Sequence, residues 1–393
     1  MFILLLKKSV KSIQLILNEF VLSENKDYTI TAGAFTKARK KFKHTAFIEL
    51  NEDILETYYR DDNIKRYQGF RILAFDGSRI TLPNTPEIKN EFGIRSIGNA
   101  TGSNIGEYSR ATFIACYDVL NNIAVESKLA GCESYEPDLA DKMLHNLKSD
   151  DLAIFDRGFA SYIFMAALIQ YDRAFIIRCP RSSFRAVQEM FDQDVADKVV
   201  TVKVPYKHKQ KAIAKNLPAE IKIKLIRIVL PSGDVEVLAT SVDKLSEIKN
   251  DQFEYLYNLR WGVETYFSKL KGRLNLDNFT GKSSESIRQD FWSTIFISNL
   301  ETIMTENIDE NLVSGNSDNL KVKVNKAVSF NIIKNMAFDI FYNELDRDKI
   351  FKKLDKLFKM NLVTLRTNRN IPRKQFSNII SYNYQKRKRK HVF

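Results

Sequence analysis

Three acidic residues stand at positions that suit metal-dependent chemistry. Asp76 follows the apolar run 72–75, and Asp156 follows a second apolar run, 152–155. Continuous apolar runs of this length are typical of strands that are covered on both faces. Glu264 lies in a stretch with helical periodicity. Two aspartates at one edge of a sheet and a glutamate from a helix across that edge would supply the oxygen ligands that Mg²⁺ or Mn²⁺ prefers.

Two such ions would define the reaction of this site. Metal ions held about 3.5 to 4 Å apart can activate a water or a 3′-hydroxyl and stabilise the leaving oxygen of an in-line displacement at phosphorus. Each acid also has an ordinary structural explanation, because segments 76–77 and 156–158 match turn sequences. Glu264 could form a surface ion pair with Arg260 or Lys271. The conjunction of the three acids favours phosphoryl transfer.

Residues 255–274 are expected to form one helix that carries two stripes. At 3.6 residues per turn the stripes lie about 90° apart. The apolar stripe, which can anchor the helix on a core, consists of Leu256, Leu259, Val263, Phe267, Leu270 and Leu274. The second stripe places a carboxylate among groups that bind phosphate, namely Tyr257, Arg260, Glu264 and Lys271. This arrangement suits an enzyme that acts on nucleic acid.

Composition points to a polyanionic partner. The chain has 393 residues, a net charge of +13 and 44% hydrophobic residues, with a pI of about 9.3. A chain of this size can form two or three domains with cores that need no disulfide or metal. Such a charge favours nucleic acid as the partner, although a merely basic protein has the same composition.

The cysteines and the apolar segments indicate a cytoplasmic protein. Cys116, Cys132 and Cys179 are odd in number and far apart, which argues against a disulfide framework and a thiolate zinc site. The opening MFILLL is followed by two lysines and is too short for a signal peptide. No apolar run approaches the length that spans a membrane.

The first 67 residues are predicted to be helical and to bind DNA. One helix is expected over 9–20, a second begins after Thr31 as N-cap, and 51–67 forms a further helix or connector. The second helix should turn Phe35, Ala38 and Phe42 inward and its basic residues outward, namely Lys37, Arg39, Lys40, Lys41 and Lys43. This pair resembles a helix-turn-helix module. A solvated helix face would explain the same pattern.

The next segment is predicted to be an α/β core. The order of elements is βββαβαβ, a three-strand meander followed by alternating helices and strands. A Gly- and Asn-rich loop is expected over 93–106. The strands are expected near 72–75, 111–120, 123–131, 152–155 and 174–179, and the helices over 136–147 and 162–171. This order fits a mixed sheet with helices on both faces.

The regions after the core differ in character. Residues 181–240 alternate apolar with polar residues, contain a hairpin turn at 232–234, and form a β-rich insertion before the key helix. Its lysines could bind a DNA backbone or simply be solvated: Lys203, Lys207, Lys209, Lys211, Lys222 and Lys224. Helices are expected over 286–304, 325–345 and 347–360, with a loop at 307–319 and a basic, solvated tail from 366 that can add DNA affinity.

The sequence resembles a known family at these motifs. Tyr257, Arg260, Glu264 and Lys271 reproduce the Y-(2)-R-(3)-E-(6)-K signature of the transposases of the insertion-sequence group typified by IS4, which are DDE recombinases with a ribonuclease-H-like core. The segments FDGSRITLP and IFDRGFAS look like the first two acidic motifs of that family. The resemblance covers about 70–300 and includes the position of the β-rich insertion.

The resemblance implies roles for individual residues. Asp76, Asp156 and Glu264 would be the metal-binding catalytic triad, while Tyr257, Arg260 and Lys271 would contact phosphates near the cleaved end. An aromatic residue near this place in related transposases stacks on a flipped base, which would be Trp261 here. A tryptophan on a helix is more often part of a core, as we expect of Trp292.

The implied protein is a DNA transposase that works as a dimer on paired ends. Its expected regions are an N-terminal DNA-binding region over 1–67 and a catalytic core in two parts, 68–180 and 241–306. The β-rich insertion over 181–240 separates the two parts. A helical C-terminal region over 307–365 and the basic tail over 366–393 follow. The alternatives are a metal-dependent DNA nuclease with the same core and a transposase-derived DNA-binding protein without catalysis.

Overall fold

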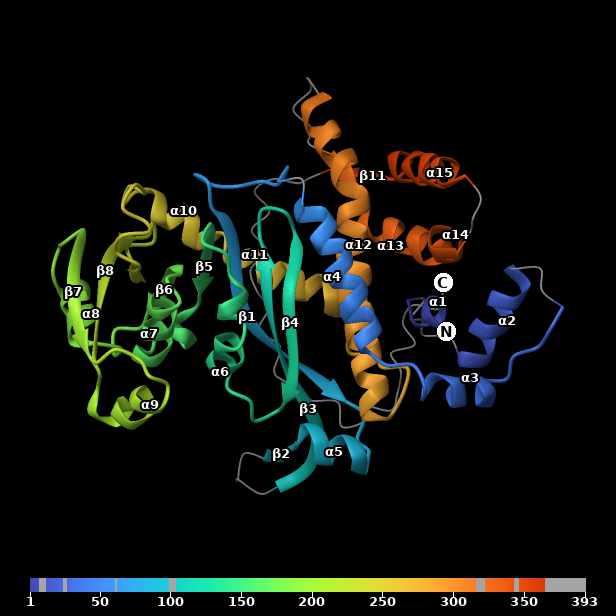
Figure 1. Ribbon diagram of the computed structural model, residues 1–393, viewed down its shortest axis with the longest axis horizontal. Coiled ribbons are helices and arrows are strands. Elements are labelled where there is room, and N and C mark those ends of the chain that lie inside the picture. Colours follow the sequence, from blue (N-terminus) through green and yellow to red (C-terminus); the bar gives the residue numbers. More distant parts are fainter. Residues whose placement is uncertain are drawn as a thin grey trace. The chain divides into compact units, whose positions relative to one another are not determined.

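The computed structural model describes residues 1–6, 12–23, 27–60, 62–98, 104–315, 322–342 and 346–364 (Figure 1). The chain forms two compact units. Unit 1 is formed by Met1–Asp62, Ile80–Arg110 and Lys269–Phe393, and unit 2 by Asn63–Arg79 and Ala111–Ser268. Strands β1 and β3 each continue from one unit into the other.

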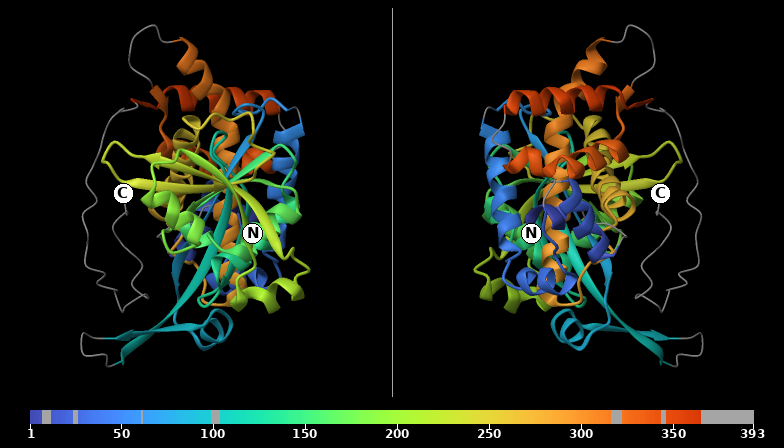
Figure 2. Two further views of the ribbon diagram at one scale, coloured as in Figure 1. Left: turned by 90° about the vertical axis from the view of Figure 1, so that its left-hand side faces the viewer. Right: turned by 90° about the vertical axis from the view of Figure 1, so that its right-hand side faces the viewer.

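One mixed sheet contains nine strands of the described residues. Their order is β2-β3-β1-β5-β6-β9-β8-β7, with β4 also paired to β3. The pairs β1–β5 and β5–β6 are parallel, and the pairs along β6–β9–β8–β7 are antiparallel. The strands are β1 Arg71–Leu82, β2 Ile94–Gly98, β3 Asn104–Asp118, β4 Ile123–Gly131, β5 Asp151–Phe155, β6 Ala174–Cys179, β7 Asp197–Lys203, β8 Glu220–Val229 and β9 Val235–Thr240. In Figure 2, neighbouring strands are rotated relative to one another, as the intrinsic twist of strands requires.

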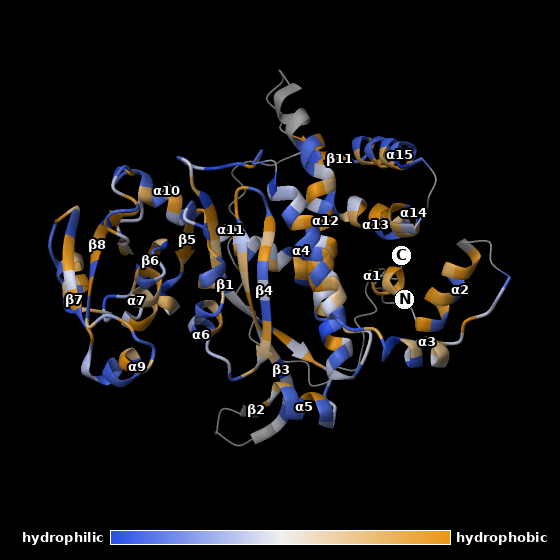
Figure 3. Ribbon diagram, viewed as in Figure 1, coloured by the Kyte–Doolittle hydropathy of each residue, from blue (hydrophilic) through white to orange (hydrophobic). Residues whose placement is uncertain are grey.

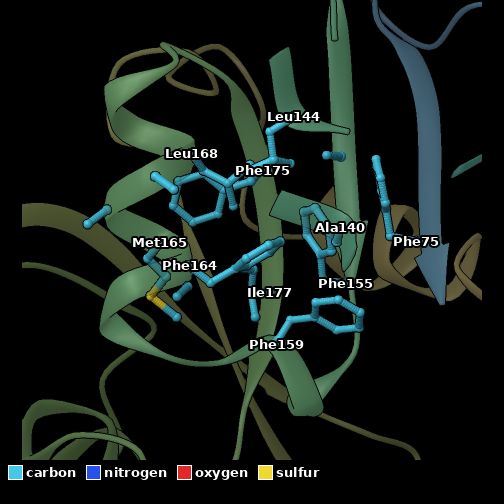
Figure 4. Close-up of a cluster of buried hydrophobic side chains, with 14 of the residues drawn as sticks. Phe75, Ala140, Leu144, Phe155, Phe159, Phe164, Met165, Leu168, Phe175 and Ile177 are labelled. Atoms are coloured by element: carbon cyan, nitrogen blue, oxygen red, sulfur yellow. The ribbon is translucent and has the colours of Figure 1, made fainter. Parts of the chain in front are cut away.

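Helices of unit 2 cover both faces of its part of the sheet. Successive side chains of a strand point to opposite faces, so Leu73 and Phe75 join one core and Ile72 joins the other. The first core, part of which Figure 4 shows, is completed by α6 Glu136–Asp141, α7 Tyr162–Gln170, α8 Arg185–Asp192 and α9 Lys209–Ala214. The second is completed by α10 Gln252–Asn258. The expected mixed sheet flanked by helices is confirmed.

A buried ion pair fixes the register of the two central parallel strands. Arg71 and Asp151 are register partners at the start of β1 and β5. The guanidinium Nε and Nη2 donate to the two carboxylate oxygens at 2.7 and 2.8 Å, and the two side chains are only 6% and 0% exposed. The same register pairs Phe75 with Phe155, whose rings stack 4.8 Å apart. The residues that follow these two phenylalanines therefore emerge together.

The single helix expected over 255–274 is wrong. The chain forms α10, then α11 Trp261–Ser268, then a π-helical turn Lys269–Arg273. Between α10 and α11 the backbone bonds join residues three apart, from Arg260 to Tyr257 and from Gly262 to Leu259. Gly262 also lies against Val119, whose Cγ1 would be 3.1 Å from a Cβ at position 262. The helix is thus interrupted beside Gly262, which lies against Val119 just after the end of β3.

Other expectations for the core need shorter corrections. The loop expected over 93–106 contains β2 and the start of β3, which pair as antiparallel strands. The helix expected over 136–147 ends at Asp141 and is followed by a 3₁₀ turn, Leu144–Asn146. The meander order, the helix after Ser161 and the hairpin turn at Gly233, where φ is +86°, are confirmed.

Unit 1 is built around one long helix. Helix α12 Ser284–Gly315 packs against α1 Phe2–Leu6, α4 Thr45–Arg60, α13 Lys326–Asn335 and α15 Arg347–Lys359. Aromatic rings of Phe2, Phe47 and Phe296 meet in this core, and α1 is apolar along its length in Figure 3. The remaining elements are α2 Ile13–Ser23, α3 Ala32–Arg39, α5 Pro86–Phe92, α14 Ala337–Tyr342, β10 Val322–Val324 and β11 Leu362–Thr364.

Helix α3 keeps its predicted start, and Phe35 is buried as expected, but Ala38 and Arg39 differ from the prediction. Thr31 caps the helix by accepting from the Ala34 amide at 3.1 Å, as expected. Ala38 is exposed, and Arg39, expected to point outward, is buried. Its guanidinium donates to Gln289 at 2.6 Å and to Asp290 at 2.9 Å. Arg39 therefore joins α3 to α12 and is not part of a solvent-facing basic surface.

The helices after residue 284 have other bounds than the sequence suggested. Helix α12 continues to Gly315, so the loop expected over 307–319 is wrong for 307–315. The helix expected over 325–345 is divided into α13 and α14. The basic tail from 366 lies outside the described residues. Within the described part of the chain, no helix has the length and apolar character needed to cross a membrane.

Replacing Asp151 by asparagine should destabilise the protein by about 3 to 5 kcal/mol, because the buried Arg71 guanidinium loses its counter-charge. Urea denaturation would measure the loss. Asp194→Asn is the matched control, since Asp194 pairs with Arg227 but is 97% exposed, and it should have little effect. Equal losses in the two variants would contradict a special role of the Arg71–Asp151 pair.

Candidate active site

The first two acids lie at neighbouring positions on parallel strands. Asp76 directly follows Phe75 within β1, and the Gly77 amide donates to its Oδ1 at 2.8 Å. Asp156 directly follows the end of β5 and precedes a 3₁₀ turn. Because Phe75 and Phe155 are register partners, Asp76 and Asp156 follow paired positions on neighbouring parallel strands. The first strand was expected to end at Asp76, which is wrong, because β1 continues to Leu82.

The residues around the interrupted helix add a tyrosine, an arginine and the third acid. The Tyr257 hydroxyl donates to Asp156 Oδ1 at 3.5 Å. Arg260, whose side chain is 3% exposed, donates through Nη2 to Glu264 Oε1 at 3.0 Å, and its Nη1 lies 3.8 Å from Asp76 Oδ2. The guanidinium of Arg260 thus lies between two of the predicted acids.

Arg178 and Glu236 belong to the same site and were not identified from the sequence. Arg178 on β6 donates to Asp156 Oδ1 at 3.0 Å and to Glu236 Oε1 on β9 at 2.6 Å. Its guanidinium lies 5.8 Å from the centre of the Tyr257 ring. The one signal available in the sequence was a single charged residue within the apolar strand AFIIRC.

Glu136 is a further carboxylate that sequence reasoning missed. It is the first residue of α6, and its carboxyl group lies so close to Gly77 that a Cβ at position 77 would collide with it. Burial raises the pKa of Glu136, Arg79 lowers it and the charge of Asp156 raises it further. A side chain at position 77 would therefore require the Glu136 carboxyl group to move.

Burial makes Asp76 an unusually weak acid. Desolvation raises its pKa to about 6, against the lowering effects of the Gly77 amide and Arg260, and the charges of Glu136 and Glu264 raise it as well. Burial also raises the pKa of Tyr257 well above its usual range. The tyrosine hydroxyl therefore stays protonated and remains a donor to Asp156. The site concentrates negative charge, which Arg178 and Arg260 offset in part.

The donor chemistry of the site fits a hard divalent cation. The acids named above offer carboxylate oxygens, which Mg²⁺ and Mn²⁺ prefer. Across the residues that the structure describes, no three His, Cys, Asp or Glu side chains converge as a metal site. The guanidinium groups of Arg260 and Arg178 lie on the carboxylates instead. Coordination by three carboxylates at once would require these arginine side chains to move.

The remaining predicted site residues have mixed surroundings. Trp261 is 44% exposed and lies 4.5 Å from the Arg260 guanidinium, so it is not a core residue, whereas Trp292, expected to be core, is half-buried. Lys271 belongs to unit 1, where burial and the charge of Arg110 lower its pKa and Asp277 raises it. The predicted basic residues of the N-terminal helices and of residues 181–240 that are exposed are Lys37, Lys40, Lys41, Lys43, Lys203, Lys207, Lys209, Lys211 and Lys222.

Asp76→Asn should stabilise the metal-free protein at pH 7 by up to about 3 kcal/mol. A carboxyl whose pKa is raised from 3.8 to about 6 on folding costs stability progressively as the pH rises between those values, and the amide does not. The gain should disappear below about pH 4. Urea denaturation in EDTA across this pH range would test it, with Asp194→Asn as control; a pH-independent difference would contradict the raised pKa.

Comparisons with known proteins identify the family of the chain. The family model described as "Transposase DDE domain" matches residues 67–300. A search of curated proteins gave no match. Among solved structures, the chain is similar to a piggyBac transposase in a synaptic complex with hairpin DNA, determined by cryo-EM, with 12% identity and a TM-score of 0.39. The similarity covers 73% of this chain and 57% of that one. With more than half of its length matched, the chain belongs to the family of proteins with a transposase DDE domain.

Proposed function

We propose that the protein is a DNA transposase that binds the terminal inverted repeats of its own element, cuts DNA strands with a divalent metal and joins the freed 3′-hydroxyl to target DNA. The observation that carries the proposal is the shared register of β1 and β5, which delivers Asp76 and Asp156 to one edge beside an arginine that reaches Glu264. The family match over 67–300 supports the same conclusion.

In this proposal Asp76, Asp156 and Glu264 hold Mg²⁺ or Mn²⁺ after the arginine side chains have moved aside. The metal would supply activation of the attacking oxygen and stabilisation of the leaving one. Tyr257 orients Asp156 through its hydroxyl. Arg260, once released from the carboxylates, offers a planar fork that matches a phosphate.

DNA contacts outside the acids complete the proposal. Trp261 presents an exposed ring, and stacking on an unpaired base contributes about 1 to 3 kcal/mol. Lys271 supplies a point charge for a phosphate near the cleaved end. Lys37, Lys40 and Lys41 are exposed on and after α3 and form a basic surface for the duplex. We further propose that two copies act on paired ends, in the cytoplasm.

Substituting any triad member by its amide, Asp76→Asn, Asp156→Asn or Glu264→Gln, should reduce Mg²⁺-dependent cleavage of DNA carrying the element's ends by at least about 100-fold, because each change removes a ligand charge. Binding of the same DNA should be retained. Gel assays of cleavage and of binding would measure the two effects. Asp194→Asn is the matched control, and full cleavage by a triad variant would exclude that residue from the metal site.

Strand transfer separates a transposase from a nuclease with the same core. Purified protein incubated with end DNA, a target plasmid and Mg²⁺ should produce joined products, because the freed 3′-hydroxyl can replace water as nucleophile at the same site. Sequencing of the junctions would identify them. Cleavage without joining would favour the nuclease, and DNA binding without cleavage would favour a protein that has lost catalysis.

A further inference from the structure

Arg178 is held in the site by two carboxylates from different strands. Its Nη2 bonds Asp156 and its Nη1 bonds Glu236, and the side chains are 26%, 32% and 19% exposed respectively. The Nε of Arg178 is buried and has no hydrogen-bond partner in the described structure. The guanidinium is therefore anchored by its two outer nitrogens and has no bond that ties it to the surrounding backbone.

A divalent cation on Asp156 would oppose the bond between Asp156 and Arg178. The same oxygen, Asp156 Oδ1, accepts from both Arg178 and Tyr257. A cation bound to this carboxylate would lie within a few ångströms of the guanidinium, where like charges repel strongly outside bulk water. Metal binding would therefore weaken the hold of Asp156 on Arg178.

Glu236 would keep the released side chain at the site. Its bond to Nη1 does not depend on Asp156, and the Tyr257 ring packs near the guanidinium. Arg178 would stay at the sheet edge with one side of its fork open. A phosphate oxygen is the anion that such a fork recognises best, and DNA brings phosphates to this edge in the proposed function.

Arg260 makes comparable contacts with the other two acids. It bonds Glu264 and lies close to Asp76, while Arg178 bonds Asp156. Each of the three predicted metal ligands thus has a guanidinium against it. Arg260 is part of the motif recognised in the sequence; Arg178 and Glu236 are not.

We infer that Arg178 is a phosphate-binding residue that Asp156 holds back until its charge is taken up by a cation, and that Glu236 is the positioning residue that keeps Arg178 at the site during the exchange. The inference rests on the proposed function, because the phosphate belongs to DNA. If the inference holds, the charge of Asp156 affects DNA binding through Arg178.

A double-mutant cycle without metal tests this dependence. Asp156→Asn removes the carboxylate charge as a cation would, so it should release Arg178. Binding of a short linear duplex of arbitrary sequence is measured in EDTA at several salt concentrations for the wild type, Asp156→Asn, Arg178→Gln and the double variant. One added phosphate contact steepens the slope of log affinity against log salt by about 0.9.

The expected result is a steeper slope for Asp156→Asn than for the wild type, with no such change between Arg178→Gln and the double variant. Affinity itself can rise in both backgrounds, since a negative charge near DNA has been removed. Glu236→Gln combined with Asp156→Asn should lose part of the effect. An equal change of slope in both backgrounds, or none in either, would overturn the inference and leave Arg178 with the role of orienting Asp156.

Two controls separate this inference from other failures. Arg185→Gln on α8 makes the same charge change at a side chain that is 92% exposed, and Asp156→Asn should still steepen the slope in that background. If Arg178→Gln does not fold, the variant Arg178→Gln with Glu236→Gln replaces it, alone and combined with Asp156→Asn. The expected slopes are the same as for Arg178→Gln. A folded wild-type protein that binds no duplex would overturn the proposed function and, with it, this inference.

Discussion

The parallel register of β1 and β5 is the constraint on which the site depends. Arg71 and Asp151 lock this register at one end of the strands, in an environment where an unpaired charge would be very costly. Because a shift by one residue moves every side chain to the other face of the sheet, the same register decides which faces Phe75 and Phe155 occupy. It thereby places Asp76 and Asp156 directly after paired positions of the two strands.

Charge neutralisation inside the protein is the second theme of the site. Asp76 is buried enough to raise its pKa to about 6, and Glu136 and Glu264 add to the excess of negative charge. Arg178 and Arg260 offset part of it through direct bonds. Burying the Asp76 carboxyl group lowers stability, a cost that functional sites commonly carry.

The sequence predicted the parts of the site that depend on local patterns. Apolar runs ending in Asp76 and Asp156 identify buried strands, since their signal lies within a few residues. At the break before α11, Gly262 lies against Val119, which is far away in the sequence. Arg178 meets Glu236 only through the pairing of β6 with β9. Arg39 was expected to face solvent because the helical pattern of the sequence shows only that its side chain is charged. The pattern does not show that Asp290, a buried acid, pairs with it inside the protein.

The pairing of β9 with β6 also limits how the chain can be re-engineered. Residues 181–240 look like a removable module in the sequence, yet β9 is hydrogen-bonded along β6 and carries Glu236 into the site. A chain shortened across this region would leave β6 as an open edge, and exposed edges recruit other strands. Residues 181–240 therefore form part of the site. They are suitable for substitution and unsuitable for deletion.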